Sequence, residues 1–259
     1  MFKWLNKLRE KNRLYFALLW IVVYIVLNSA AIPLSALIGV ESSAALAVNA
    51  VLSALLFFWL KSNGLAEHYG LRRVDIPASR FLFYIPLIVF MSRNLWFGFA
   101  INFPPAGTVC YILSMLLVGF LEEVIMRGLL FRALAEKNVK TAIIITSVTF
   151  GLGHIVNLFN GSGMDLVANI CQVFSAVGCG FLFVIIFHRS GSLIPCIVAH
   201  SVHNAVSVFG NEAGITAQKR IIFSVVTVIL VVGYALILMK TLPKNEYSEP
   251  ENIEAGEQG

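Results

Sequence analysis

The sequence has 259 residues, of which 58% are hydrophobic and only 13% are charged, and its mean hydropathy is +0.83. Soluble domains average about 45–50% apolar and about 25% charged residues, so the composition argues against a soluble fold and predicts a membrane protein. The net charge of +5 does not indicate nucleic acid as a partner, because the basic residues lie mainly in short connections between apolar stretches.

Eight apolar stretches follow one another along the chain, each close to the roughly 20 residues that cross a bilayer as a helix. They cover residues 14–32, 44–61, 81–103, 107–131, 140–158, 168–187, 193–209 and 221–239. The first follows a basic segment but lacks a small-residue cleavage site, so we interpret it as a retained span and not as a signal peptide. The sequence therefore predicts an all-α, polytopic transmembrane bundle of about eight helices.

The lysines and arginines predict the orientation of this bundle, because basic residues are enriched in cytoplasmic segments. They gather in the N-terminal tail and in alternate connections: Lys3, Lys7, Arg9, Lys11, Arg13, Arg72, Arg73, Arg80, Arg132, Lys137, Lys140 and Arg189. Both termini are therefore expected in the cytoplasm, and the compact loops suit a bacterial cell membrane. Residues 1–242 are expected to form one domain, and the polar tail 243–259 is expected to be disordered.

The fourth apolar stretch contains three ionisable residues, Glu122, Glu123 and Arg127. Each costs roughly 2.5–3.5 kcal/mol to place in hydrocarbon, so such groups need partners and typically mark a function. Glu123 and Arg127 are four residues apart and share a helix face, which favours an ion pair, whereas Glu122 is rotated from Glu123 by about 100°. A purely structural ion pair is the alternative, but it leaves the second carboxylate unexplained.

The fifth stretch adds His154, and the seventh adds His200, His203 and Asn204. His200 and Asn204 share one helix face, whereas His203 lies about 60° away and is more typical of a packing residue. A rise of about 1.5 Å per residue places Glu122, His154 and His200 at similar depths, roughly 15–21 Å from the cytoplasmic ends of their helices. Such a group can activate water and stabilise an oxyanion.

These residues resemble the motifs of a known family, the CAAX prenyl proteases and bacteriocin-processing enzymes, also called the CPBP or abortive-infection family. The family pattern is EExxxR, then FxxxH, then HxxxN. Here the three motifs occur in that order as Glu122-Glu123 with Arg127, Phe150 with His154, and His200 with Asn204. Phe150 shares a helix face with His154 and is expected to pack beneath it.

The resemblance implies an intramembrane peptidase acting on a membrane-tethered peptide or protein, of the CAAX type or similar to a bacteriocin precursor. It assigns roles to six residues: water activation to Glu122 and His154, ordering of the site to Glu123 and Arg127, and oxyanion binding to His200 and Asn204. Residues 1–242 would then form a single transmembrane peptidase domain, with the lipid bilayer and the substrate as its partners.

The involvement of a metal stays open at this point. Glu122, His154 and His200 can bind a divalent ion such as zinc with water in the fourth position, as in a metalloprotease. The same residues can act on a hydrogen-bonded water in a glutamate-type peptidase. Convergence to about 2.0–2.2 Å from a common point would favour zinc.

Two other functions fit the same residues. A transporter or proton-relay protein would arrange the buried acids and histidines along the membrane normal, and a catalytically silent immunity protein of the same family would keep the motifs without cleaving. Other intramembrane peptidases fit less well, because the sequence has no HExxH or GxGD motif and Ser162 lies in an expected outer loop. Arg93, in the third stretch, can snorkel, mark an earlier helix end or bind substrate.

Overall fold

The computed structural model describes residues 2–243, apart from the side chains of Leu82 and Phe83. Its α-helices are α1 (Lys3–Lys11), α2 (Arg13–Ile38), α3 (Ser43–Ser62), α4 (Ile85–Ser92), α5 (Pro105–Glu123), α6 (Arg132–Ala135), α7 (Val139–Gly153), α8 (Leu166–Ser190), α9 (Ile194–Val206) and α10 (Ala217–Thr241). A π-helix, η3 (Val124–Phe131), joins α5 to α6. Except for Pro243, the tail predicted from residue 243 onward lies outside the described residues.

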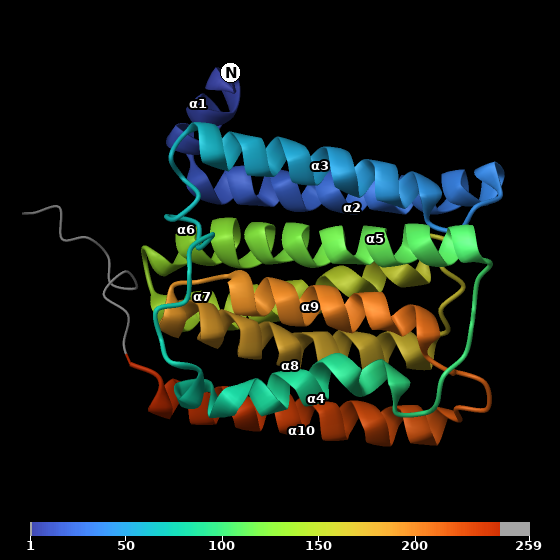
Figure 1. Ribbon diagram of the computed structural model, residues 1–259. Helices are drawn as coiled ribbons and strands as arrows, with labels where there is room; N and C mark the ends of the chain where they lie inside the picture. Colours follow the sequence, from blue (N-terminus) through green and yellow to red (C-terminus); the bar gives the residue numbers. More distant parts are fainter. Residues whose placement is uncertain (1, 244–259) are drawn as a thin grey trace, which may run out of the picture.

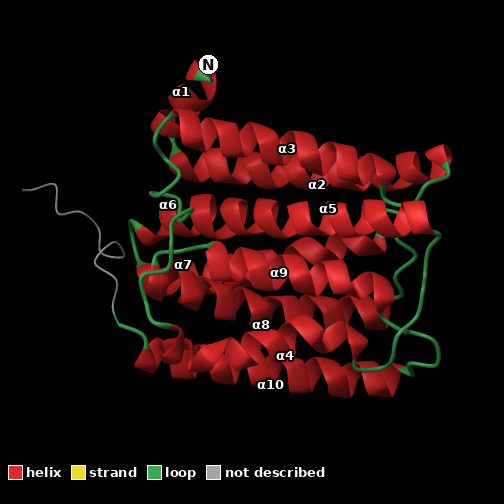
Figure 2. Cartoon of the chain, in the orientation of Figure 1, coloured by secondary structure: helices red, strands yellow, loops and turns green. Residues whose placement is uncertain are grey.

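Short 3-10 helices extend or precede several of these elements. They are η1 (Ala78–Tyr84), η2 (Arg93–Leu95), η4 (His154–Leu158) and η5 (Ser207–Phe209). Among the described residues, β pairing is confined to an isolated bridge between Phe99 and Gly210, and loops occur mainly at the ends of the helices (Figure 2). The all-α class predicted from the sequence is confirmed.

Six helical runs in the described part of the chain are long and apolar enough to cross a bilayer. They are Arg13–Ile38, Ser43–Ser62, Pro105–Ala135, Val139–Leu158, Leu166–Ser190 and Ala217–Thr241. Many of their side chains are exposed hydrophobic groups, such as Val26, Ile144 and Ile229, which are 58%, 62% and 65% exposed. A surface of this kind fits hydrocarbon, so the chain is a multi-pass integral membrane protein.

The helix count differs from the predicted eight. With the continuous run Pro105–Ala135 counted once, residues 2–243 form nine helices, and the additional one is α1. The third predicted stretch, 81–103, does not form one span, because its apolar helical run covers only Ile85–Leu95. Gly98 follows with a φ of +108°, a conformation that a continuing helix does not allow.

The additional helix α1 is amphipathic and packs across the end of α3. Leu5 is its buried residue, whereas Trp4 is 66% exposed. Asn6 accepts a hydrogen bond from Trp59 Nε1 at 2.8 Å and donates one to the Asn63 side chain. The apolar windows did not predict α1, because a polar helix with one buried face carries no membrane-span signal.

The helices lie side by side and connect at the two ends of the bundle (Figure 1). α2 and α3 lie along one edge, α4 and α10 along the opposite edge, and α5, α7, α8 and α9 lie between them. The N-terminal helix and the end of α10 are at the same end of the bundle (Figure 1). The central position of α5 and α9 determines where the polar residues meet.

The close approach of α5 and α9 depends on Gly119. A Cβ atom at this position would lie 2.2 Å from Ser201 Oγ and 2.6 Å from the Ser201 backbone nitrogen. Ser201 Oγ also donates to the Leu116 carbonyl at 2.8 Å, so a side-chain hydrogen bond joins the two helices beside the glycine. Small residues at such contacts let helix backbones approach in membranes.

Replacing Gly119 by alanine should therefore separate α5 from α9 and destabilise the bundle by about 1–3 kcal/mol, despite the better helix propensity of alanine. The melting temperature of the purified protein in detergent measures this change. Gly233→Ala in α10 is the matched control, because a Cβ atom there would have no neighbour within 4 Å. Equal melting temperatures for the two variants would show that the α5–α9 contact is not close.

Candidate active site

The polar residues of the first motif lie where α5 changes into a π-helix. Glu122 and Glu123 form the end of α5, and Arg127 belongs to η3, whose eight residues are all buried. A π-helix forms i→i+5 hydrogen bonds, is rare, and occurs frequently at functional sites. α9 packs along α5 and brings His200 to this point.

Arg127 and Glu123 form a fully buried ion pair. Arg127 Nη1 donates to Glu123 Oε1 at 2.9 Å, and both side chains are 0% exposed. Nη2 donates to the Gly180 carbonyl of α8 at 3.4 Å. The guanidinium carbon lies 4.2 Å from the centre of the Phe150 ring and 5.5 Å from that of Phe183, which are distances of cation–π contact. The ion pair predicted from the spacing of the two residues is confirmed.

His200 lies between the two glutamates. Its Nδ1 is 2.8 Å from Glu123 Oε1, and its Nε2 is 3.6 Å from Glu122 Oε2. The first contact keeps a proton on Nδ1, because a carboxylate only accepts hydrogen bonds. An unprotonated Nε2 would then face a second acceptor, and the two would repel. The geometry therefore favours an additional proton on one of these two groups, which lie at ion-pair distance.

Glu122 is the less constrained of the two carboxylates, as its rotation from Glu123 predicts. Its Oε1 accepts a hydrogen bond from the hydroxyl of Tyr24 in α2 at 2.7 Å. Its Oε2 is buried and has no hydrogen-bond partner among the described residues. The side chain is 15% exposed, compared with 0% for Glu123.

Phe150 of α7 links the two histidines of the motifs. Its ring packs edge-on against His154 and His200, with centroid distances of 5.3 and 5.6 Å. His154 Nδ1 lies 3.0 Å from the Phe150 carbonyl oxygen, and Asn169 Nδ2 donates to the His154 carbonyl at 2.8 Å. A proton on Nδ1 in this contact leaves Nε2 of the neutral ring as an acceptor, which is the form of a general base.

Asn204 and His203 point to different surroundings. The Asn204 side chain is half-buried, and within residues 2–243 it forms no hydrogen bond. His203 turns to α4, where its Nδ1 is 3.1 Å from the Phe90 carbonyl oxygen and its ring stacks on that of Phe90 at 4.3 Å. His203 is thus a packing residue in this structure, and His200 is the histidine that contacts the glutamates.

The structure brings four of the six predicted site residues into direct contact: Glu122, Glu123, Arg127 and His200. His154 joins them through the ring of Phe150, and Asn204 lies one helical turn beyond His200. Phe150, expected only to pack beneath His154, also touches Arg127 and His200.

The residues do not fit zinc in this arrangement. No three His, Cys, Asp or Glu side chains in the described part of the chain are grouped as a metal site requires. His200 directs Nδ1 to Glu123 and His154 directs Nδ1 to a backbone carbonyl, so Nε2 is the ring nitrogen that each leaves for another partner. The described residues themselves supply carboxylates, imidazoles and an amide at this point.

Tyr24 is the site residue that the sequence did not predict. It lies 98 positions before Glu122, in a span with no family motif. The polar residue near it in the sequence is Asn28, four positions later. The Asn28 side chain donates a hydrogen bond to the Tyr24 carbonyl at 3.1 Å. Tyr24 lies near the middle of α2 and belongs to no spacing pattern with the other polar residues of the site, so the sequence does not single it out.

A family model described as Type II CAAX prenyl endopeptidase Rce1-like matches residues 104–206. The match ends with the last residue of α9 and includes all three motifs and all six predicted site residues, but not Tyr24. No curated protein and no solved structure shows a significant similarity to the chain. The predicted family resemblance is thus confirmed, and the match supports a membrane-embedded protease.

Replacing Arg127 by methionine tests the buried ion pair, because it retains an unbranched side chain but leaves Glu123 buried without its cation. We expect a loss of about 3–5 kcal/mol, seen as a lower melting temperature in detergent. Arg220→Met is the control, since it breaks an exposed pair with Glu212 at 3.1 Å and should change stability by no more than about 0.5 kcal/mol. Similar losses in both variants would contradict the importance of burial.

Proposed function

We propose that the chain is an intramembrane endopeptidase that hydrolyses a peptide bond of a membrane-tethered peptide or protein with water activated by Glu122 and His154. The observation that carries this proposal is Glu122 Oε2, which is buried, has no hydrogen-bond partner within the described residues and lies 3.6 Å from His200 Nε2. The match of residues 104–206 to an endopeptidase family supports the same reaction.

Charge balance suggests the protonation state of the resting site. Two carboxylates, Glu122 and Glu123, face one guanidinium, Arg127, in an apolar interior where unbalanced charge is costly. One additional proton on His200 makes two positive and two negative groups. His200 then donates from Nδ1 to Glu123, and its Nε2 proton faces Glu122.

Glu122 is placed to act as the base because one of its oxygens accepts a hydrogen bond from the protein and the other does not. Tyr24 donates to Oε1 and holds the carboxylate in place. Oε2 remains able to accept a proton from water, and a positioned general base contributes about 10²- to 10⁴-fold to a rate. His154, with Nε2 as an acceptor, lies on the other side of Phe150 and is proposed to relay the proton.

The proposed reaction proceeds in two steps. Water forms a C–O bond to the scissile carbonyl carbon while its proton passes to Glu122, and the carbonyl electron pair moves onto oxygen. His200 and Asn204 would donate to this oxyanion. The proton then passes from Glu122, with His154, to the amide nitrogen. The C–N bond breaks to give a carboxylic acid and an amine, and the proton of the acid passes to the amine as the two products leave.

The contacts support a peptidase over a proton relay. A relay needs acids and histidines spread along the membrane normal, but Glu122, Glu123, Arg127 and His200 contact one another in one compact group. A catalytically silent member of the family would have the same geometry, so activity decides between these two readings.

The substrate is proposed to reach the site from the bilayer. Glu122 and His200 lie within their helical runs and not at the ends, which suits a scissile bond in a membrane-tethered segment. Prenylated C-termini and bacteriocin precursors are candidates from the family resemblance. We place the protein in a bacterial cell membrane with both termini in the cytoplasm, which agrees with the common end shared by α1 and the end of α10 (Figure 1).

Glu122→Gln and His154→Ala should each reduce cleavage of a membrane-tethered peptide library by at least about 100-fold, because each removes a proton acceptor. Purified protein and mass spectrometry of the products give the measurement. Glu212→Gln, at an exposed loop carboxylate, should cleave like the wild type. If Glu122→Gln and His154→Ala also cleave like the wild type, the proposed mechanism is wrong. The same assay with a chelator and zinc add-back measures any metal requirement.

Tyr24→Phe should lower kcat by about tenfold or more with little change in KM, because a hydrogen bond to a charged group contributes about 1.5–3 kcal/mol. Tyr234→Phe is the matched control: it also removes a buried hydroxyl, one that donates to the Phe81 carbonyl at 2.9 Å, far from the glutamates. Equal kcat values for Tyr24→Phe and Tyr234→Phe would mean that Tyr24 does not position Glu122.

A further inference from the structure

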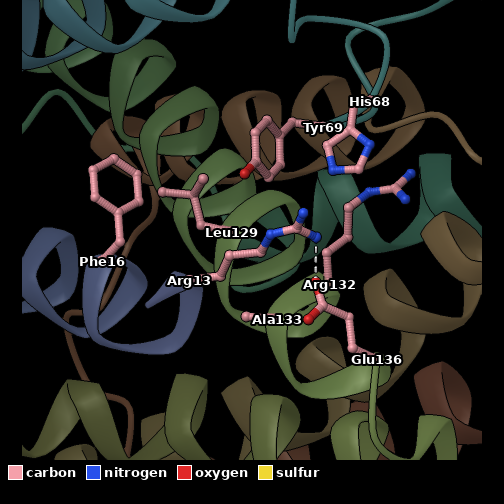
Figure 3. A pocket seen from close by; sticks show the side chains of 8 residues that line it. All are labelled: Arg13, Phe16, His68, Tyr69, Leu129, Arg132, Ala133 and Glu136. Atoms are coloured by element: carbon pink, nitrogen blue, oxygen red, sulfur yellow. Dashed lines mark hydrogen bonds and ion pairs between the residues drawn. The ribbon is translucent and has the colours of Figure 1, made fainter. Parts of the chain in front are cut away.

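A small cavity lined by both charged and apolar side chains lies at the end of the bundle where α2 begins and α6 ends. Figure 3 shows Arg13 and Arg132 side by side in the lining of this cavity, with His68 and Tyr69 above them. The Arg13 guanidinium faces Glu136, and the Arg132 guanidinium turns away to the right. His68 and Tyr69 belong to the connection after α3. None of these residues contacts the glutamates of the candidate active site, so the cavity is a separate feature.

The cavity is positively charged. Arg132 has a buried Nε without a hydrogen-bond partner among the described residues, and its guanidinium carbon lies 5.0 Å from the centre of the Phe187 ring. Partial burial, together with the positive charges of Arg132, Arg13 and Arg9, lowers the pKa of His68 to about 4. The histidine is therefore neutral at pH 7 and can donate a hydrogen bond without adding charge.

Glu136 shows which type of group this cavity accepts. Its carboxylate binds Arg13 Nη1 at 2.5 Å, and both side chains are 50% exposed. Exposed ion pairs of this kind are weak, so a stronger external anion can displace the carboxylate. Because the cavity itself has a volume of only about 10 Å³, the incoming group would take the place of the Glu136 carboxylate beside Arg13, and Arg132 would have to turn toward it.

We infer that this cavity is a binding site for a phosphate group, held by Arg13 and Arg132. Guanidinium groups match phosphate geometry and bind it through two parallel hydrogen bonds. The cavity lies at the start of a membrane span, beside the amphipathic α1, where lipid headgroups are expected. Basic pockets between helices on the cytoplasmic side bind anionic headgroups, but a free phosphate presents the same chemistry.

The bound phosphate would connect two elements that form the candidate active site. α2 carries both Arg13 and Tyr24, and the continuous run Pro105–Ala135 carries both Glu122 and Arg132. A phosphate that bridges the two arginines therefore holds α2 against the helix that supplies the carboxylates. Phosphate binding does not depend on peptidase activity, so it can be tested separately.

The test uses the full-length purified protein in detergent and three probes: phosphatidylglycerol, phosphatidylcholine and inorganic phosphate. Native mass spectrometry measures lipid binding, and the shift in melting temperature measures phosphate binding. We expect phosphatidylglycerol to bind at least tenfold more tightly than phosphatidylcholine. Arg13→Gln and Arg132→Gln should each weaken this binding at least tenfold, and Glu136→Gln should strengthen it, because it removes the internal competitor.

Arg220→Gln is the matched control, since it alters another arginine–glutamate pair outside the cavity, with a distance of 3.1 Å. Loss of phosphatidylglycerol binding in the two cavity variants alone supports a lipid headgroup site. Stabilisation by inorganic phosphate with the same pattern, but without lipid selectivity, supports a site for free phosphate. Failure of both probes to bind, or equal binding in the cavity variants and Arg220→Gln, would overturn the inference.

Discussion

The charge of two adjacent carboxylates within an apolar bundle is the constraint on which the rest of the site depends. Arg127 neutralises only one of them, and both Arg127 and Glu123 are completely buried. Since unbalanced charge is costly in hydrocarbon, the second carboxylate requires another positive group, and His200 is in position to provide it. The same requirement keeps Glu122 near a proton that can move, which is the property that a peptidase acting through water needs.

The surrounding helices maintain this charge balance. The π-helix η3 keeps Arg127 buried beside Glu123, and the rings of Phe150 and Phe183 contact its guanidinium. Gly119 lets α9 approach α5 closely enough for His200 to reach Glu123. Tyr24, from a helix outside the family match, then fixes one oxygen of Glu122. Each of these contacts limits the freedom of a charged group, so the site is organised before a substrate arrives.

The sequence predicted the membrane class, the helical stretches and the Glu123–Arg127 pair, because hydropathy and helical spacing are local properties. It did not predict α1, whose polar composition hides a buried face, or the early end of the third stretch before Gly98. The contact between Tyr24 and Glu122 and the position of His200 between two carboxylates depend on how distant helices pack. Neither hydropathy nor helical spacing predicts which distant helices pack together. The exact turn type of η3 was likewise not visible in the spacing of Glu123 and Arg127.

The central claim is that water attacks the scissile carbonyl directly while Glu122 takes its proton. A single turnover with excess enzyme in H₂¹⁸O, followed by mass spectrometry of both product and protein, tests this claim most directly. The account predicts one ¹⁸O atom in the new carboxylate of the product and none in the protein segment that contains Glu122. A product without ¹⁸O, or a labelled Glu122, would show that the carboxylate itself attacks the substrate and would contradict the account.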